Sequence, residues 1–146
     1  MITYANAEDI LTSCFLQRWA DTTPVSLKNA IPKELDDSVQ EWVHFTARIN
    51  ASSQTSIGAV GNRRYTRVGR IAVDIFVKAG TFTGAQTDLV KKVVDMYEDG
   101  SWSNVRIHQI LQHDLPDGAH RRASITGDGR WYGTQINIQF SFDEVK

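Results

Sequence analysis

The segment from Arg63 to Lys78 constrains the fold more than any other part of this chain. From Ile71 onward its odd-numbered positions are all apolar, which is the period-two pattern of a half-buried β-strand. A strand of about sixteen residues measures roughly 50 Å, whereas a compact domain of this length has a radius of gyration of only about 15 Å. We therefore expect this strand to extend past its own core and to contact another subunit there.

The first half of this strand carries charge instead of a continuous apolar stripe. Its cationic residues are Arg63, Arg64, Arg67 and Arg70. The alternating segment Glu41–Asn50 is its natural antiparallel partner, and Ser-rich residues 51–62 between them read as a loop. The pattern predicts a projecting β-hairpin arm. Arginines on such an arm either prevent indiscriminate edge pairing or contact an acidic partner or nucleic-acid phosphate, and we rank a protein partner first.

The other apolar patterns complete a single domain over residues 1–146. Helical spacing predicts helices over about 7–20 and 84–99, and further strands are expected at 105–115, with a bulge before Ile110, and from Tyr132 to Phe142. Residues 25–27 could form a short edge strand. The predicted fold class is α+β, in the order α-β-β-α-β-β, with an antiparallel or mixed β-sheet and two helices packed on one face.

The last strand has the clearest alternation in the chain. Its core-facing positions are Tyr132, Thr134, Ile136, Ile138, Phe140 and Phe142, and its opposite positions are Gly133, Gln135, Asn137, Gln139 and Ser141. The opposite face of this strand is therefore polar and uncharged. Such a face suits contact with a neighbouring subunit or the lining of a channel.

The sequence offers no assembled catalytic or metal site. The four histidines lack metal-ligand spacing, Cys14 lies within a helical apolar stripe, and no G-x-S-x-G nucleophile elbow occurs. The run 127–130, with its two glycines, leads into a strand rather than a helix and so predicts a turn, not a phosphate loop. We expect a soluble, non-enzymatic protein without a cofactor, made in a cytoplasm and with no membrane-spanning segment.

Several stretches together resemble one protein family. They are EWVHF at 41–45, QTSIG at 54–58, RYTRVG at 64–69, VDIFVKAGT at 73–81 and the closing strand from Trp131-Tyr132 to Asp143-Glu144. In these stretches the chain is similar to the tail terminator proteins of long-tailed bacteriophages. The Arg-Tyr-x-Arg-x-Gly string and the Phe-Val-x-Ala-Gly string carry the resemblance, which covers most of the chain from about residue 24 onward.

The resemblance implies a structural role in the virion. Members of that family form a ring, commonly hexameric, at the head-proximal end of the tail tube. The ring ends tube polymerisation, provides a docking surface for head-completion proteins and lets DNA pass through its lumen. The resemblance therefore implies that this chain has itself, the tube protein and a head-completion protein as partners, and that it carries no catalytic residues.

The residues expected at the subunit or tube interface follow from the arm and from the enrichment of Trp and Tyr at interfaces. They are Arg48, Gln54, Ile57, Arg63, Arg64, Tyr65, Arg67, Trp102 and Trp131. Two alternatives remain open at this stage. One is another head–tail connector or tail completion factor, and the other is a small nucleic-acid-binding domain that uses the Arg63–Arg70 arm.

Overall fold

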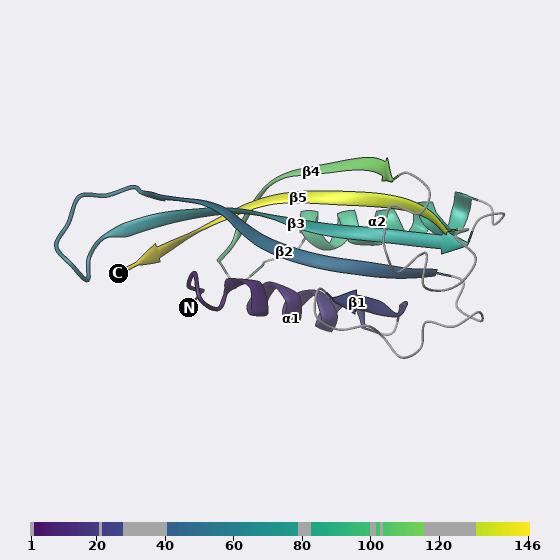
Figure 1. Ribbon diagram of the computed structural model, residues 1–146, viewed down its shortest axis with the longest axis horizontal. Coiled ribbons are helices and arrows are strands. Elements are labelled where there is room, and N and C mark those ends of the chain that lie inside the picture. Colours follow the sequence, from purple (N-terminus) through teal and green to yellow (C-terminus); the bar gives the residue numbers. More distant parts are fainter. Residues whose placement is uncertain are drawn as a thin grey trace.

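The computed structural model describes residues 2–20, 22–27, 41–78, 83–99, 102, 104–115 and 131–146. The chain is α+β, with two helices and a five-stranded mixed sheet (Figure 1). The elements are α1 (Ala7–Trp19), β1 (Val25–Leu27), β2 (Glu41–Gln54), β3 (Arg64–Lys78), α2 (Thr83–Asp99), β4 (Arg106–Leu115) and β5 (Trp131–Val145).

The sheet has the strand order β1-β2-β3-β5-β4. Strand β1 runs parallel to β2, and every other neighbouring pair is antiparallel. Residues 25–27, which could form a short edge strand, do form one, so the element order is α-β-β-β-α-β-β instead of the predicted α-β-β-α-β-β. The antiparallel pairing of β2 with β3 is confirmed. A register shift in β4 between Ile107 and Gln109 confirms the predicted bulge.

Both helices pack on one face of the sheet. The apolar residues of α1 and α2 join the alternating apolar residues of the strands in one buried cluster. Its largest members include Phe15 and Trp19 of α1, Tyr97 of α2, and Phe140 and Phe142 of β5. Cys14, expected to be buried, is half-buried beside this cluster. We call the helix-covered side the core face and the other side the open face.

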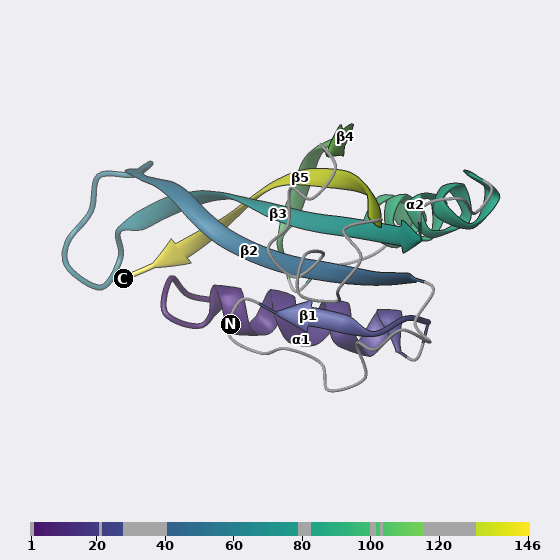
Figure 2. The same cartoon turned by 45° about the vertical axis from the view of Figure 1, so that its right-hand side comes forward.

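The boundaries of the long hairpin differ from the prediction. Strand β2 continues to Gln54 instead of ending at Asn50, so the first four residues of the expected loop belong to the strand. A register shift between Ile49 and Ala51 makes Asn50 a bulge residue. Bulges bend a strand and increase its twist, and the twist of β2 over β3 is visible in Figures 1 and 2.

The predicted two-stranded arm is not confirmed. Strand β5 pairs with β3 along its whole length, from Lys78 with Trp131 to Arg64 with Val145. Three strands, β2, β3 and β5, therefore continue beyond both helices at the left of Figure 1. The turn predicted at residues 127–130 lies outside the described residues.

Candidate functional site: the distal end and the open face

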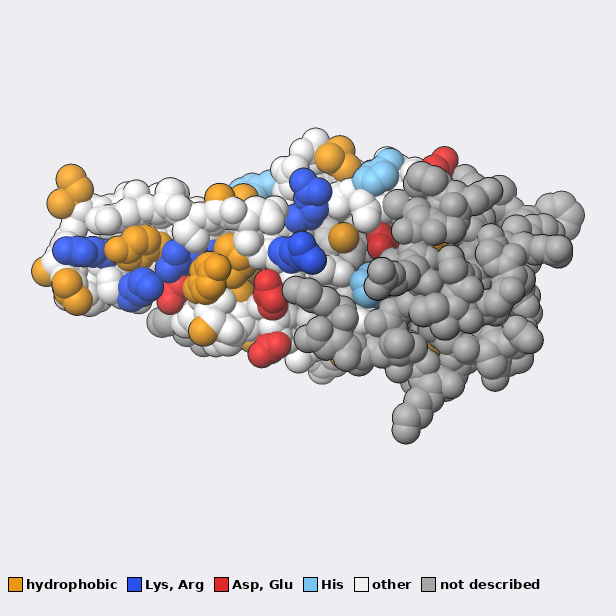
Figure 3. Space-filling model, viewed as in Figure 1, with side chains coloured by type: hydrophobic (Ala, Val, Ile, Leu, Met, Phe, Trp, Pro, Cys, Tyr) orange, Lys and Arg blue, Asp and Glu red, His pale blue; other side chains and the backbone are white. Residues whose placement is uncertain are grey.

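The end of the sheet farthest from α2 gathers most of the predicted interface residues. We call it the distal end and define it as β2 residues 51–54, loop 55–63, β3 residues 64–68, and residues 143–146. Figure 3 shows hydrophobic and basic side chains intermingled there. Apolar side chains beside cations, away from a core, are the composition expected of a protein-binding surface.

Exposed apolar side chains concentrate at the distal end. Ile57 is fully exposed and Val60 is 84% exposed, and both lie in the loop. Val68 and Val145 on the strands, and Tyr4 just before α1, are also exposed. Ile57, Val60, Val68 and Val145 account for most of the large exposed apolar side chains of the described residues, and Tyr4, Leu16 and Leu111 lie outside the distal end as defined. The sequence had indicated Ile57 alone.

The cations of the distal end differ in their surroundings. Arg64 is exposed, whereas Arg63 is half-buried and its Nε donates a hydrogen bond of 2.9 Å to the Gly58 carbonyl, which fixes the loop. Gln54 is exposed, and its Nε2 donates a hydrogen bond of 2.8 Å to the Ser56 carbonyl, which also holds the loop in place. Tyr65 is half-buried beneath Lys146, whose Nζ lies 5.6 Å from the ring centre.

Arg67 is not part of the exposed surface. Its Nη2 lies 3.0 Å from Glu144 Oε2, and both side chains are about nine-tenths buried. The guanidinium is also flanked by the rings of Tyr4 and Tyr65, at 5.3 and 5.0 Å. The core-facing stripe therefore reaches farther along β3 than predicted, since Phe142, the cross-strand neighbour of Arg67, is completely buried.

The two tryptophans proposed for the interface have different outcomes. Trp102 is a core residue, 1% exposed, stacked on Tyr97 with ring centres 4.3 Å apart. Its Nε1 donates to the Met96 carbonyl at 3.1 Å, and Arg18 lies over its ring. Trp102 is therefore part of the core and not of the subunit surface. Trp131 begins β5 opposite Lys78, and its side chain lies outside the described residues.

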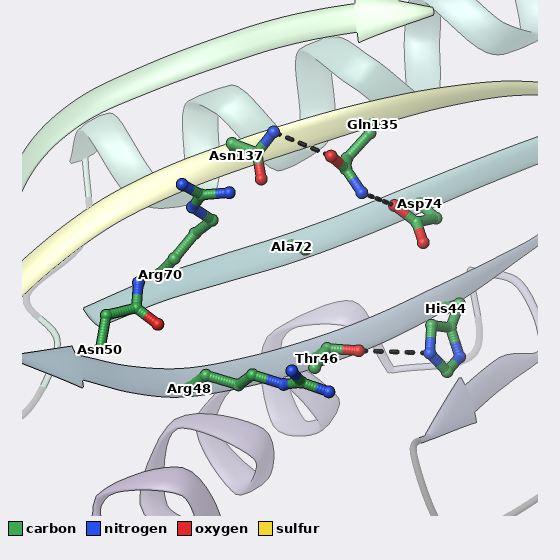
Figure 4. Close-up of a pocket in the computed structure, with 9 residues that line it drawn as sticks. All are labelled: His44, Thr46, Arg48, Asn50, Arg70, Ala72, Asp74, Gln135 and Asn137. Carbon is green, nitrogen blue, oxygen red and sulfur yellow. Dashed lines mark hydrogen bonds between the residues drawn. The ribbon is translucent and has the colours of Figure 1, made fainter. Parts of the chain in front are cut away.

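The open face carries a hollow lined by polar side chains of three strands (Figure 4). Its volume is about 520 Å³. The lining residues are His44, Thr46, Arg48, Asn50, Arg70, Ala72, Asp74, Gln135 and Asn137. The open face of β5 is uncharged from Gly133 to Ser141, and Asp143 follows on the same face. In the hollow, β2 and β3 add two arginines and one aspartate, which the last strand alone did not indicate.

Hydrogen bonds hold one side of this hollow in place. Gln135 Nε2 donates to Asp74 Oδ1 at 2.7 Å, and Asn137 Nδ2 donates to Gln135 Oε1 at 2.9 Å. Burial raises the pKa of Asp74 above its usual range, while the Gln135 hydrogen bond and the charge of His113 act in the opposite direction. On the β2 side, His44 lies between Ser26 and Thr46, at 3.1 and 3.2 Å.

Arg48 and Arg70 form the cationic part of the hollow. They are direct cross-strand partners of β2 and β3, and both are exposed. Neither takes part in an ion pair with any residue that the structure describes. Arg48 was expected at an interface from its place in the hairpin, but the sequence gave no sign that Arg70 lies directly opposite it, because register is a tertiary property.

The outer sheet edges are available for strand addition within the described part of the chain. Strand β1 pairs only with Val43–Phe45, so no described strand pairs with the outer edge of β2 from Thr46 to Gln54. The outer edge of β4 is likewise unpaired there. Unpaired edges present backbone donors and acceptors that can extend the sheet of another molecule.

The described residues contain no group of three or more His, Cys, Asp or Glu side chains placed to hold a metal ion. His44, His108 and His113 each lie on the open face, where their described hydrogen-bond neighbours are Ser, Thr and Asn side chains. Among the described helices, none is both long enough and apolar enough to cross a membrane.

Comparison with known proteins gives a fold but no family. No family model matches the chain, and no curated protein matches its sequence. One solved structure, of a protein that carries only a serial designation, is similar over 91% of this chain and 93% of its own, with a TM-score of 0.56. At 14% sequence identity, this similarity supports the fold alone.

Proposed function

We propose that this chain is a non-enzymatic virion protein that caps the head-proximal end of a phage tail tube by forming a ring. The sequence resemblance to tail terminator proteins is the reason for proposing this role. The observation that carries the proposal is the gathering of exposed apolar side chains, Ile57 and Val60 foremost, where three strands extend beyond the helices. A solvated monomer gains nothing from such a surface, whereas a neighbouring subunit would bury it.

In the proposed ring, the distal end of one subunit lies against the body of the next. This is a heterologous contact, and such contacts generate closed rings when the rotation between subunits closes. The unpaired outer edge of β2 lies beside the distal loop. Strand addition along this edge would add backbone hydrogen bonds to the apolar contact. The three-stranded extension replaces the two-stranded arm expected from the sequence.

Imaging tests this proposal most directly. The purified chain is examined by negative-stain electron microscopy, alone and with tube protein, and its mass is measured by sedimentation. We expect rings, or ring-capped tubes when tube protein is present. A chain that stays monomeric and leaves tube ends uncapped at all concentrations would contradict the proposal.

Another head–tail completion factor would share much of this surface, so tube length separates the two roles. Loss of a terminator gives overlong tubes, whereas loss of a connector gives tubes of normal length without heads. The nucleic-acid alternative draws on Arg63, Arg64 and Lys146 at the distal end. It predicts DNA binding that weakens steeply with salt, because each phosphate contact releases counterions.

A further inference from the structure

The open-face hollow contains two arginines that the described part of the fold does not neutralise. Arg48 and Arg70 are directly opposite each other in the β2–β3 ladder. Like charges at such positions repel each other and destabilise a sheet. By contrast, Arg67 of β3 bonds Glu144, and Arg106 of β4 bonds Asp143. The unpaired couple is therefore a local cost that an anionic ligand would relieve.

We propose that this hollow binds an acidic segment of a partner protein, whose carboxylates are bonded by Arg48 and Arg70. In Figure 4 the Arg70 guanidinium points toward Asn137 of β5 and the Arg48 guanidinium points toward Thr46 of β2, so the two groups border the hollow on different sides. A guanidinium matches a carboxylate with two parallel hydrogen bonds. Each guanidinium therefore offers its own fork to an acidic side chain of a segment that lies in the hollow.

The neutral lining of the hollow suits a peptide. Asn50, Asn137 and Gln135 line it and provide amide donors and acceptors of the kind that bond a peptide backbone. Asn50 is the bulge residue of β2, and Figure 4 shows its amide at the Arg70 end of the hollow. A hollow of about 520 Å³ falls within the usual range of roughly 300–1,000 Å³ for ligand sites, and it accommodates a short segment better than a flat protein surface.

The same lining disfavours nucleic acid. Affinity for a phosphate backbone grows with the number of cations along the track, and this hollow offers two arginines followed by the carboxylate of Asp74. The bases of single strands stack on aromatic rings, and no aromatic residue other than His44 is among the lining residues.

This inference is independent of ring formation, because the hollow lies within one subunit. Its test uses a fluorescently labelled hexaglutamate peptide as the probe, with binding followed by fluorescence anisotropy at low salt. We expect the double substitution Arg48→Gln and Arg70→Gln to weaken binding by about tenfold or more, because charge-assisted hydrogen bonds are the strong ones. The matched control is Arg106→Gln, an arginine near the same face already paired with Asp143, which should change the affinity less than about twofold.

A further variant separates charge from geometry and guards against misfolding. Arg70→Lys keeps the charge but loses the planar fork, so we expect it to bind the peptide with intermediate affinity. Far-UV circular dichroism reports whether each variant folds. The proposal is overturned if hexaglutamate does not bind at millimolar concentration, or binds the wild-type chain and the double variant equally. It is also overturned if an oligothymidylate binds more tightly than the peptide and loses that binding in the double variant.

Discussion

At the scale of single residues, Gly69 determines how closely three strands approach at the point where the sheet twists. A Cβ atom on Gly69 would lie 2.3 Å from the Arg48 carbonyl oxygen and 2.5 Å from Phe140 Cζ. Gly69 faces Ile49 on one side and Phe140 on the other. The Phe140 ring therefore occupies the space that a side chain would need, next to the bulge at Asn50.

We predict that Gly69→Ala destabilises the fold by about 1–3 kcal/mol, since overpacking forces backbone or ring displacement. Urea denaturation followed by circular dichroism measures the change. The matched control is Gly84→Ala in α2, where an added Cβ meets no atom within 4 Å. This control should be neutral or stabilising by up to about 1 kcal/mol. Equal stabilities of the two variants would show that the close approach is not limiting.

The buried pair of Arg67 and Glu144 shows where prediction from sequence stops at this scale. The sequence indicated a cationic strand but not which arginine would be neutralised, because Glu144 is 77 residues away and pairs only once β3 and β5 are in register. The backbone N–H of Tyr4 adds a third group, donating to Glu144 at 3.1 Å. Contacts between three distant segments have no local signal in the sequence.

Removing the charge of Glu144 leaves Arg67 buried without a counter-ion. Glu144→Gln should destabilise the protein by about 3 kcal/mol, as expected when one partner of a buried ion pair is removed. The residue before Glu144, Asp143, forms an exposed ion pair with Arg106. Asp143→Asn breaks that pair and should lower the free energy of unfolding by less than about 1 kcal/mol. Thermal or urea unfolding of the two variants gives the comparison. A similar loss in both would mean that the Arg67 pair is not effectively buried.

At the scale of elements, the sequence predicted where strands lie from their alternating apolar residues, but it did not predict where each strand ends. Alternation predicted β3 and β5, because a face packed against helices selects apolar residues at every second position. The extension of β2 through Ala51-Ser52-Ser53-Gln54 had no such signal, since these residues have low strand propensity. Pairing with Tyr65–Val68 supplies the backbone hydrogen bonds that hold them in the strand.

The Arg48–Arg70 couple on the open face gives a prediction about stability. Replacing Arg48 by Thr removes the like-charge contact and introduces a residue that favours strands. We therefore expect Arg48→Thr to stabilise the free protein, by about 0.2–1 kcal/mol. Urea denaturation at low salt checks this, and added salt should reduce the difference because it screens the repulsion. A loss of stability would indicate that the arginine makes a favourable contact instead.

The ionisation of Asp74 makes the free energy of unfolding depend on pH. Its pKa in the folded chain is raised, chiefly by burial, above the ordinary 3.8. The folded state therefore retains the proton to higher pH than the unfolded state, so the free energy of unfolding falls as pH rises from 3.8 through the folded pKa. Asp74→Asn keeps an oxygen that accepts the hydrogen bond from Gln135.

This variant should be more stable than the wild-type chain at neutral pH, and the difference should shrink as the pH falls through the folded pKa of Asp74 toward 3.8. Unfolding curves between pH 3 and pH 7 provide the measurement. A wild-type advantage that grows toward neutral pH would show the reverse sign and mean that the folded environment stabilises the carboxylate. The control is Asp114→Asn on the exposed part of β4.

At the scale of the whole molecule, the described fold has a covered half and a bare half. Both helices cover one part of the sheet, and β2, β3 and β5 run on beyond them (Figure 2). The sequence anticipated this from strand length alone, since the chain in β3 is too long for a compact core. It could not anticipate that β5 accompanies β3 to its end, which makes the extension a stiffer three-stranded sheet.

In the proposed ring, the bare half contacts the neighbouring subunit. Substitutions in the loop at its tip test this contact. Ile57→Ser with Val60→Ser removes the two most exposed apolar side chains while leaving the core intact. We expect the monomer to unfold at the same denaturant concentration as the wild-type chain, since neither residue packs in the core. We also expect assembly into rings to weaken by at least about tenfold in protein concentration, because burying two such side chains contributes roughly 1.5–3 kcal/mol each.

Sedimentation over a range of concentrations measures this shift. The matched control is Leu111→Ser, which removes an exposed apolar side chain from β4, away from the distal end. If the control weakens assembly and the double variant does not, the contact lies along β4 instead. Assembly that resists both sets of changes would leave backbone pairing along the β2 edge as the dominant interaction, because hydrogen bonds between strands do not depend on these side chains.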